Sequence, residues 1–579
     1  MPISIRIALA QQQSFELHCG HQSRRVDWKD IESLSATADR DYFGDDHAND
    51  SHWAPKFPQL TALGRSLFQW LDGPEGWLRA GLTNRETTVL LDLAAPLQAQ
   101  DLNPATESLL RKLAHLPWEL LHDGKVFLAE LGVQPIRVMQ SRSAVAQPAN
   151  RPLRLLFMAT SPEDVLPVLD YEREEATILE ATRQQPVDLV VEESGSVSQL
   201  QNLVASFGKD YFDVFHITGH GMIEAGTPQF LTEDERGGAQ RTTAPQLAEA
   251  FGSRWPRLLF LSGCHTAQAP DRGAIPSMAH ALVNAGADAV LGWARPVYDS
   301  TGIFAATQLY RALATGETPL DAVAATRREM LGAFLRDANQ SFCSDWHLLR
   351  IYQGVRDTAA LVTPLKTPNR ERIKRKPPEP EFLDSDGNIK VAGASAFIGR
   401  RRELQRCLRA LAFPGDHYGV FLHGIGGYGK STIAARLCRR HEAQNPGFER
   451  VVLIGPVEED RLRQRLSDKF GGIPEVIAVL NQPKIEFKQQ LAGFLDIIES
   501  KGRKLLLVLD DFEQNIPAAH VEDGSLRLVP GAWSALEALC FALEESGAAS
   551  RLIVTCRYHC LLYTSSARRT YRERADRVE

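Results

Sequence analysis

Unbroken apolar runs alternate with amphipathic stretches over residues 153–355. Short runs that are apolar throughout are typical of buried strands in a parallel sheet. Amphipathic stretches at 172–183 and 278–284 lie between the runs and favour helices that cover both faces of such a sheet. The pattern therefore predicts an α/β sandwich on a mostly parallel sheet, with strands at 153–159, 187–193, 212–218, 256–262 and 287–294.

The chain on either side of this region has a different pattern. Residues 1–150 mix short strand-like runs with one helix-like stretch at 107–122. Residues 358–395 are rich in proline and charge, which is typical of an inter-domain linker because proline removes backbone donors. A basic cluster at 372–376 could contact an acidic partner, although a solvated linker is the simpler interpretation. The predicted N-terminal strands are at 4–8, 87–92 and 133–140.

Composition narrows the class of protein without changing this picture. Of the 579 residues, 44% are apolar and 24% charged, and the net charge of −7 gives no general attraction to nucleic acid or an anionic membrane. No apolar run approaches the roughly 18 residues that span a bilayer, and the N-terminus lacks the basic start of a signal peptide. Eight cysteines without paired or zinc-ligand spacing fit a reducing compartment, so the sequence predicts a cytoplasmic protein.

A histidine and a cysteine follow two of the predicted strands. His220 comes after the strand at 212–218 in VFHITGHG, and Cys264 comes after the strand at 256–262 in LLFLSGCH. If these strands are parallel neighbours, both side chains leave the sheet at the edge where α/β proteins bind ligands. The glycines beside both residues would allow sharp turns with positive φ or the close approach of a substrate.

This pairing supplies what a cysteine nucleophile needs. A thiol with a pKa of roughly 8.5 is mostly protonated at neutral pH, and a neighbouring imidazole lowers that pKa or accepts the proton. The attacked carbonyl develops negative charge, and the backbone amides of Gly221 and Cys264 are candidates to stabilise it. The arrangement favours a nucleophilic pair over two unrelated residues.

Simpler explanations exist for each residue alone. A lone cysteine at a strand end is usually a small buried apolar residue, and a lone histidine is usually structural. His216 and His265 are rivals for the base, but we expect His216 to be packed inside its strand and His265 to point away from the cysteine. The cysteines that lack such a context are interpreted as core or surface residues: Cys19, Cys343, Cys407, Cys438 and Cys540.

The segments VFHITGHG and LLFLSGCHTA resemble the CHAT domain, a branch of the caspase–separase group of cysteine peptidases. The resemblance implies a caspase-like α/β sandwich, with His220 as general base and Cys264 as nucleophile, that performs limited cleavage of a protein substrate. Asp288 and Asp299 could select basic side chains at the cleavage site, although exposed loop carboxylates are the simpler interpretation. Further blocks match the family in the expected order: LAHLPWELLHDG at 113–124, IPSMAHALVNAGADAVLGWARPV at 275–297 and DWHLLRIYQG at 345–354.

A phosphate-binding motif follows the linker. VFLHGIGGYGKST at 420–432 combines a strand, the Walker A pattern and the start of a helix, which is the context that this motif requires. Its glycines expose backbone N–H groups to phosphates at a helix N-terminus. Lys430 would reach the β- and γ-phosphates, and Ser431 would bind Mg²⁺. The residues expected to bind the nucleotide here are Gly424, Gly426, Gly427, Gly429, Lys430, Ser431 and Thr432.

Two further strands complete the predicted nucleotide site. KLLLVLDDFEQ at 504–514 ends in the Walker B pair Asp510 and Asp511. We expect Asp510 to hold Mg²⁺ through its water shell and Asp511 to orient an attacking water. A buried strand with a turn-forming aspartate pair is the alternative, which the Walker A loop upstream disfavours. RLIVTCR at 551–557 ends in Arg557, which could sense the γ-phosphate or be a surface arginine.

The order FIGRRREL at 397–404, Walker A, paired-aspartate Walker B and a strand ending in arginine resembles the STAND class of signalling ATPases, of the NB-ARC and NACHT kind. The resemblance implies a P-loop NTPase domain with a mostly parallel sheet that uses ATP, ADP and Mg²⁺ as a switch. ADP would hold a closed monomer and ATP would favour self-association, with ATP hydrolysis open. The winged-helix segment and sensor histidine typical of the class are not found in this sequence.

Residues 560–579 lose all periodicity and become rich in arginine, and CLLYTS within them resembles translated sequencing-adapter sequence. We expect an artefactual tail on an NTPase domain that is truncated before its helical lid. A charged terminal helix is the alternative.

These features predict a cysteine endopeptidase that an ATP-binding STAND module regulates and that cleaves a protein partner in bacterial signalling or defence. The alternative is a nucleotide-switched scaffold whose caspase-like domain binds partners without catalysis. A metabolic P-loop enzyme is a weaker interpretation because no substrate-binding motif accompanies the loop. The expected divisions are an N-terminal region at 1–80 that packs on the peptidase domain, the peptidase domain at 81–357, the linker at 358–395, the NTPase domain at 396–559 and the tail at 560–579.

Overall fold

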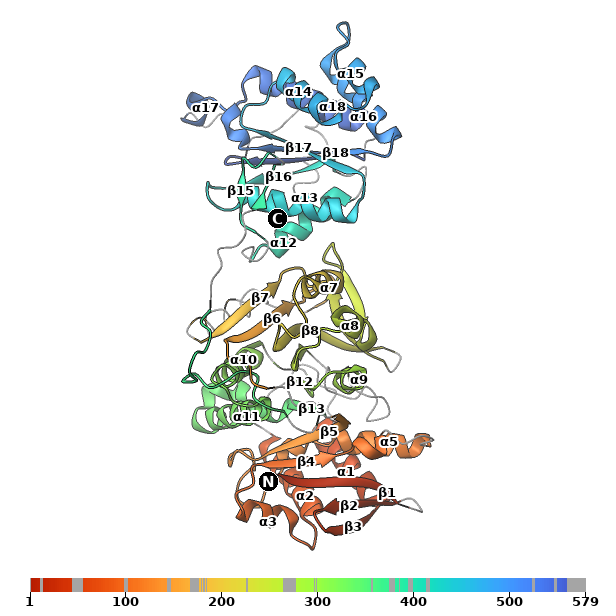
Figure 1. The fold of residues 1–579 in the computed structure, drawn as a ribbon, viewed down its shortest axis with the longest axis vertical. Helices are drawn as coiled ribbons and strands as arrows, with labels where there is room; N and C mark the ends of the chain where they lie inside the picture. Colours follow the sequence, from red (N-terminus) through yellow and green to blue (C-terminus); the bar gives the residue numbers. More distant parts are fainter. Residues whose placement is uncertain are drawn as a thin grey trace. The chain divides into compact units, whose positions relative to one another are not determined.

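The structure is a computed structural model, and it describes residues 2–559 apart from a set of short segments. The chain divides into two compact units, residues 1–375 and 376–579, and each is described by itself (Figure 1). The segments outside the description are 11–13, 44–55, 98–102, 143–146, 167–175, 177, 179, 181, 182, 184, 225–226, 264–277, 296, 298, 356–357, 374–380, 385, 394–398, 413–416, 523–525 and 546–548. The predicted tail at 560–579 also lies outside the described residues.

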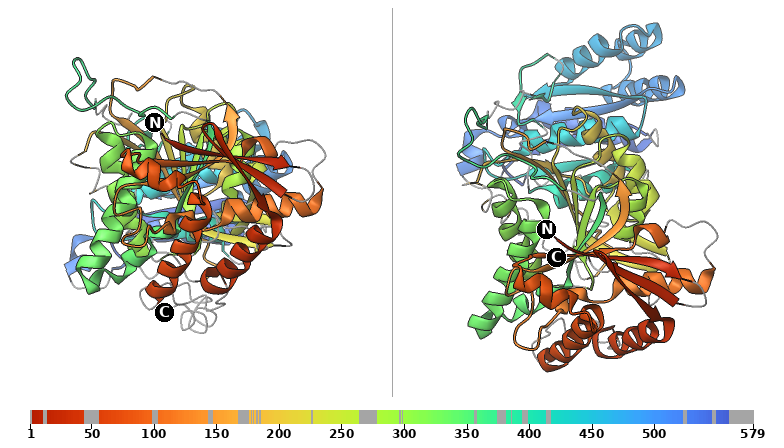
Figure 2. Two further views of the ribbon diagram at one scale, coloured as in Figure 1. Left: turned by 90° about the horizontal axis from the view of Figure 1, so that it is seen from below. Right: turned by 60° about the horizontal axis from the view of Figure 1, so that its bottom comes forward.

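One large sheet runs through the first unit (Figures 1 and 2). Its strands are β1 (Ile3–Ala10), β2 (Ser14–Cys19), β3 (Gln22–Asp27), β4 (Thr88–Asp92), β5 (Gln134–Arg142), β6 (Leu153–Ala159), β7 (Val187–Glu192), β8 (Val214–Glu224), β9 (Thr227–Glu233), β10 (Ala239–Thr243), β11 (Leu258–Gly263), β12 (Ala289–Trp293) and β13 (Leu349–Val355). β7, β6, β8, β11 and β12 are parallel neighbours in that order. The predicted α/β architecture with a large, mostly parallel sheet is confirmed.

The strand direction reverses beyond β12. β13 is antiparallel to β12, and β5, β4 and β1 follow β13 as parallel neighbours. β2 and β3 end the sheet as antiparallel strands, which are drawn in red in Figure 2. β9 and β10 extend it at the other side, because the second half of β8 pairs with β9. The N-terminal strands therefore belong to the same sheet as the strands that carry the candidate site.

Helices cover both faces of the sheet. They are α1 (Trp28–Ala38), η1 (Asp39–Phe43), α2 (Phe57–Asp72), α3 (Trp77–Thr83), α4 (Ala94–Leu97), α5 (Pro104–His115), η3 (Trp118–Leu120), α7 (Val197–Ala205), α8 (Ala244–Phe251), α9 (Met278–Ala285), α10 (Asp299–Ala314), α11 (Pro319–Arg336) and η4 (Ala338–Leu348). α7, α8 and α9 lie along one face, and α10 and α11 along the other (Figure 1). The helix predicted at 278–284 is confirmed as α9, whereas most of the helix predicted at 172–183 lies outside the described residues.

The single helix predicted at 107–122 is wrong in its extent. α5 ends at His115, and a short 3₁₀ turn, η3, follows at Trp118–Leu120. Pro117 explains the break, because proline has no N–H to donate and excludes helical backbone at the residue before it. Leu116 indeed has extended backbone, with ψ of 144°.

The 3₁₀ turn carries a buried carboxylate that joins distant parts of the unit. Glu119 is fully buried and accepts hydrogen bonds from Arg137 of β5, at 2.6 and 2.9 Å, and from Arg327 of α11, at 3.2 Å. Arg350 of β13 lies 3.7 Å from the same carboxylate. Burial alone would raise the pKa of Glu119, but the three guanidinium groups outweigh it and lower the pKa to about 2. The cluster fixes η3 and α11 to the centre of the sheet.

The second unit contains a four-stranded parallel sheet in the order β16, β19, β18, β17 and a small hairpin, β14–β15. Its strands are β14 (Glu381–Phe382), β15 (Lys390–Val391), β16 (Gly419–His423), β17 (Phe448–Ile454), β18 (Lys504–Asp510) and β19 (Arg551–Cys556). Its helices are α12 (Arg401–Ala412), α13 (Lys430–Gln444), α14 (Glu459–Phe470), α15 (Pro474–Leu480), α16 (Phe487–Ser500), η6 (Phe512–Asn515), α17 (Ala518–Glu522) and α18 (Pro530–Glu545).

β18, one of the two inner strands of this sheet, is buried on both faces, as its unbroken apolar run predicts. Leu505, Leu507 and Leu509 pack with α14, α16 and α18, while Leu506 and Val508 pack with α12 and α13 on the opposite face. The alternation follows from the period of two along a strand. The unit is therefore a three-layer α/β arrangement with the end of β18 at one edge of the sheet.

Parts of the range predicted as a linker pack onto the two units. Leu361 and Val362 are buried in the first unit, where Val362 forms a bridge with Ala149. Leu383 and Val391 of the hairpin are buried in the second. These few apolar residues lie in a polar and proline-rich stretch, so the composition of the stretch does not reveal that they are buried.

Candidate functional site

The two strands that precede the candidate nucleophilic pair are parallel neighbours. β8 and β11 are in register from Val214 opposite Leu258 to Gly219 opposite Gly263. The condition that the sequence analysis set, that these two strands are parallel neighbours, is met. Cys264, the next residue after Gly263, and His265 lie outside the described residues.

His220 lies within a strand, and the prediction that it follows a strand end is wrong. β8 continues to Glu224, and His220 is the first residue that is in register with β9, opposite Leu231. The side chain is largely buried, with 8% of the residue exposed. Gly221 is in register with Phe230 in the same ladder. His220 thus stands where β8 leaves its neighbours β6 and β11 and joins β9.

Gly219 owes its identity to close approach within the sheet. The φ angle of Gly219 is not positive, so the predicted sharp turn is wrong for this glycine. A Cβ atom at Gly219 would stand 2.0 Å from Oγ1 of Thr160 and 2.9 Å from the ring of Phe230. Thr160 in turn donates its hydroxyl to the carbonyl of Leu231 at 2.7 Å. The residue before His220 therefore has no room for a side chain.

His216, the rival for the base, is a core residue, as predicted. Its ring stacks on Phe260 with centroids 4.5 Å apart and meets the edge of Phe157 at 5.1 Å. It is fully buried, and burial lowers its pKa to about 3. The ring therefore stays neutral at physiological pH.

Side chains that the sequence analysis missed hold the carboxyl edge of the sheet together. Thr218 donates its hydroxyl to the carbonyl of Ser262 at 3.0 Å, and Nε1 of Trp293 lies 3.3 Å from Oγ of Ser262. Ser161 donates its backbone N–H to the buried carboxylate of Glu233 at 2.7 Å. Thr218 and Ser262 are opposite each other in the register of β8 and β11, so their side chains lie on the same face of the sheet. The polar residue near the end of each apolar run is the sequence signal that could have identified them.

Asp288 is not part of this edge. It directly precedes β12 and therefore stands at the amino end of a strand that is parallel to β11. It lies 3.8 Å from Arg142, and burial raises its pKa. A role for Asp288 in substrate selection at His220 is excluded by this position, whereas Asp299 is the first residue of α10.

The five cysteines that were predicted to be core or surface residues have raised thiol pKa values. Burial raises the pKa of Cys343 to about 12, of Cys407 to about 11 and of Cys438 to about 12. Burial also raises the pKa of Cys19 and Cys540, although Cys540 lies on an exposed position of α18. These thiols are poor nucleophiles at neutral pH.

In the second unit, a glycine-rich loop joins β16 to α13 as the motif predicts. Gly424, Gly427 and Gly429 have φ of 149°, 83° and 82°, which a side chain would strain. Nζ of Lys430, the first residue of α13, donates to the carbonyls of Gly424 at 2.9 Å and Ile425 at 3.3 Å. Ser431 and Thr432 follow in the first turn of the helix.

The end of β18 is hydrogen-bonded to this helix and to β19. Ser431 donates its hydroxyl to the two carboxylate oxygens of Asp510 at 3.0 and 3.1 Å, and Thr555 donates to Asp510 at 2.6 Å. Burial raises the pKa of Asp510, and these two hydrogen bonds oppose that effect. Asp511 has the left-handed φ of 53°, and its backbone N–H donates to Oγ1 of Thr555 at 3.2 Å.

Arg557 lies between this strand end and the glycine loop. Its Nε is 2.7 Å from Oε1 of Glu513, and its backbone N–H donates to Oε2 at 3.2 Å. A Cβ atom at Gly426 would stand 3.3 Å from Cζ of Arg557. Sequence reasoning found Arg557 but missed Glu513.

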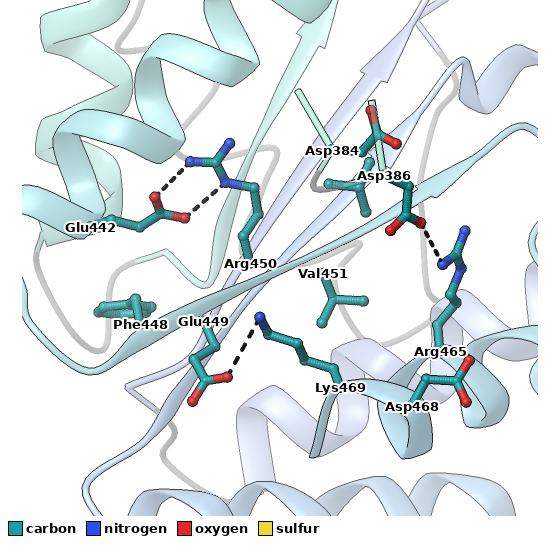
Figure 3. A pocket seen from close by; sticks show the side chains of 11 residues that line it. Asp384, Asp386, Glu442, Phe448, Glu449, Arg450, Val451, Arg465, Asp468 and Lys469 are labelled. Atoms are coloured by element: carbon teal, nitrogen blue, oxygen red, sulfur yellow. Dashed lines mark hydrogen bonds and ion pairs between the residues drawn. The ribbon is translucent and has the colours of Figure 1, made fainter. Parts of the chain in front are cut away.

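A cavity of about 580 Å³ lies beside β17, at the side of the sheet opposite β16 (Figure 3). Its three basic residues are each paired with an acidic one: Arg450 with Glu442, Arg465 with Asp386 and Lys469 with Glu449. Asp384 accepts the backbone N–H groups of Asn388 and Ile389. The Arg465–Asp386 pair joins the loop between β14 and β15 to α14. The cavity is separate from the glycine loop.

The first unit is thus a mixed α/β domain with a largely buried histidine at the carboxyl edge of parallel strands. The model of the CHAT domain family matches residues 61–354, about half of the chain, and the chain belongs to this family. It therefore contains a caspase-like, protease-related domain.

Two solved structures of the Saccharomyces cerevisiae separase–securin complex, at 2.6 and 3.0 Å resolution, are also similar to this chain. Sequence identity is 12% and 13%, each match covers 57% of this chain, and the TM-score is 0.26 in both. This chain covers 21% and 22% of the matched chains, so it spans about a fifth of their length. No curated protein matches the chain significantly. Within the described residues, no helix is long and apolar enough to cross a membrane.

Proposed function

We propose that residues 61–354 form a cysteine endopeptidase in which His220 is the base and Cys264 the nucleophile. The observation that carries this proposal is the parallel register of β8 and β11, which ends with Gly219 opposite Gly263. In the sequence, His220 follows Gly219 and Cys264 follows Gly263. A CHAT family match over 61–354 supports the same assignment.

The chemistry follows from the two residue types. The imidazole of His220 takes the proton of the Cys264 thiol, and the thiolate attacks the carbonyl carbon of the scissile peptide. Backbone amides, for which Gly221 and Cys264 are the candidates, stabilise the oxyanion. The protonated His220 then donates its proton to the leaving amine, and water hydrolyses the thioester to release the acid and the free thiol.

A nucleotide site in the second unit is part of the proposal. It is supported by the strand–loop–helix arrangement around Lys430 and by the contact of Ser431 with Asp510. Mg²⁺ prefers oxygen ligands, and the Ser431 hydroxyl and the Asp510 carboxylate supply oxygen atoms, so these two residues fit this cation. Bound Mg²⁺ would neutralise charge on the β- and γ-phosphates. Lys430 would exchange its bonds to loop carbonyls for bonds to phosphate oxygens.

We further propose that ATP in this site, in a STAND-type module, regulates the peptidase and favours self-association, in a cytoplasmic signalling or defence role with a protein as substrate. The alternative is a nucleotide-switched scaffold without catalysis. Both proposals predict nucleotide binding, and they differ only in the reactivity of Cys264.

Thiol reactivity in the full chain separates the two. We expect limiting iodoacetamide at pH 7, read by mass spectrometry at each cysteine, to modify Cys264 before the other cysteines. His220→Ala should slow that modification by about 100-fold or more, because a general base typically contributes about 10²- to 10⁴-fold. Cys540→Ala, which removes an exposed cysteine with a raised pKa, is the control and should leave the rate at Cys264 unchanged. Equal rates at Cys264 and Cys540 in the unaltered chain would support the scaffold instead.

A further inference from the structure

A carboxylate that no motif identifies stands beside the candidate nucleotide site. Glu513 lies in η6, directly after the Asp510–Asp511 pair, and 11% of its side chain is exposed. Both of its carboxylate oxygens face Arg557: Oε1 lies 2.7 Å from Nε, and Oε2 accepts the backbone N–H at 3.2 Å. Two contacts to one residue fix the base of the arginine side chain more firmly than a single ion pair would.

The guanidinium held in this way lies against the glycine loop. The three atoms nearest to an added Cβ at Gly426 are Cζ, Nε and Nη1 of Arg557, at 3.3, 3.4 and 3.6 Å. Gly426 is an interior residue of the glycine loop, which precedes the lysine that is proposed to bind the phosphates and the serine that is proposed to bind Mg²⁺. The side chain of Arg557 is still 57% exposed, so its end has room to turn.

Arginine in this position has two competing anionic partners. Glu513 offers one negative charge, whereas a terminal phosphate offers more charge and three acceptor oxygens that suit the guanidinium fork. The γ-phosphate of ATP is the group that a residue beside the middle of the loop would meet, and ADP lacks it. An arginine that leaves a carboxylate for a phosphate therefore responds to ATP and not to ADP.

We propose that Glu513 is a positioning residue that holds Arg557 beside Gly426 and competes with the γ-phosphate for it, so that Glu513 sets the preference between ATP and ADP. This proposal rests on nucleotide binding at Lys430. It assigns the carboxylate a regulatory role in the same site. A strong ion pair between Glu513 and Arg557 weakens the response to ATP, and loss of that pair strengthens the response.

The test measures dissociation constants of the full chain for methylanthraniloyl-ATP and methylanthraniloyl-ADP by fluorescence, with Mg²⁺ present. Glu513→Gln removes the charge that holds Arg557, and we expect ATP affinity to rise about 3- to 10-fold with little change for ADP, the size of effect that one ordinary hydrogen bond has. Glu513→Asp keeps the charge but is one methylene shorter, and we expect the same direction of change. This second variant also covers the case in which the glutamine variant does not fold.

A double-mutant cycle with Arg557→Ala separates positioning from general charge effects. In the Arg557→Ala background, Glu513→Gln should no longer change the ratio of the two dissociation constants. If Glu513→Gln changes ATP and ADP affinity equally, or acts identically without Arg557, the positioning role is overturned. If the unaltered chain binds neither nucleotide and Lys430→Ala changes nothing, the proposed nucleotide site itself fails, which is a different result.

Discussion

The two candidate sites stand at the same kind of place, the carboxyl edge of parallel strands, but they are built differently. At the β8–β11 edge, the backbone register and the absence of a side chain at Gly219 set the geometry beside His220, and the hydrogen bonds of Thr218 and Trp293 to Ser262 support it. At the β16–β18 edge, the polar side chains already bind one another, as Ser431 binds Asp510 and Arg557 binds Glu513. The first edge is thus sensitive to packing, whereas the second needs its internal bonds to be exchanged for bonds to a ligand.

Loss of the Glu119 carboxylate should give the largest effect, and only on the first unit. Glu119→Gln leaves three buried guanidinium groups without their anion, and breaking such a buried pair costs about 3–5 kcal/mol. Urea unfolding of the full chain, followed by tryptophan fluorescence, measures the change. Glu107→Gln, which breaks a partly exposed pair with Arg111, is the control and should cost at most about 1 kcal/mol. An equal loss in both variants would contradict the structural role of the cluster.

The same cluster predicts a pH dependence. The pKa of Glu119 is about 2 in the folded chain and near 4.5 in the unfolded chain. Its contribution is therefore complete above pH 4.5 and is lost as the pH falls towards 2. The difference in unfolding free energy between the unaltered chain and Glu119→Gln should shrink over that interval. A constant difference would show that the carboxylate is not the charged partner.

Lys430→Ala tests the second edge through ligand affinity. Lys430 bonds only to loop carbonyls of its own unit among the described residues, so its loss should leave the unfolding free energy within about 0.5 kcal/mol. Nucleotide affinity should fall by about 1.5–3 kcal/mol, the value of a hydrogen bond to a charged group. Lys501→Ala, which removes a surface pair with Glu475, is the control. If Lys430→Ala binds nucleotide as tightly as the unaltered chain does, the assignment of a nucleotide site to the glycine loop is contradicted.

Gly219→Ala tests whether packing sets the first edge. The added methyl group meets the hydroxyl and carbonyl oxygens of Thr160, which directly follows β6, and the ring of Phe230 in β9. Overpacking of this kind costs about 1–3 kcal/mol. We expect slower modification of Cys264 by iodoacetamide together with the loss of stability. Gly208→Ala is the matched control, because nothing lies within 4 Å of a Cβ atom there. If both glycine variants react alike, the close contact does not shape the site.

Local patterns predicted many of the strands in the two sheets, because strands such as β6, β8, β11 and β18 are apolar runs that need no distant information. They did not predict β2, β3, β9, β10 or β17. The continuation of β8 beyond His220 was not predictable in the same way. It depends on pairing with β9, and the two glycines around His220 interrupt the apolar run. Sequence alone therefore located the histidine but misplaced the end of its strand.

Contacts between residues that are distant in the sequence account for the other differences. Glu119 meets Arg327 across 208 positions, and Glu513 meets Arg557 across 44. Neither acidic residue belongs to a spaced motif, so no local signal marks its partner. The phosphate loop is the contrasting case, because Lys430, Ser431 and the glycines act within one short segment.

His216→Phe should have the smallest effect, and it separates the two histidines of VFHITGHG. The ring of His216 is neutral and stacked on Phe260, so a phenyl ring of similar volume should change stability at pH 7 by less than about 1.5 kcal/mol. The pKa of His216 is about 3 when folded and near 6.5 when unfolded, so the histidine chain loses stability as the pH falls below 6.5. The phenylalanine variant avoids that loss and should be the more stable of the two proteins at pH 5. Urea unfolding at pH 7 and at pH 5 measures this difference.

In the His216→Phe variant, modification of Cys264 should proceed at the unaltered rate, in contrast to His220→Ala. A slowing as large as that of His220→Ala would make His216 the base and would overturn the assignment of His220.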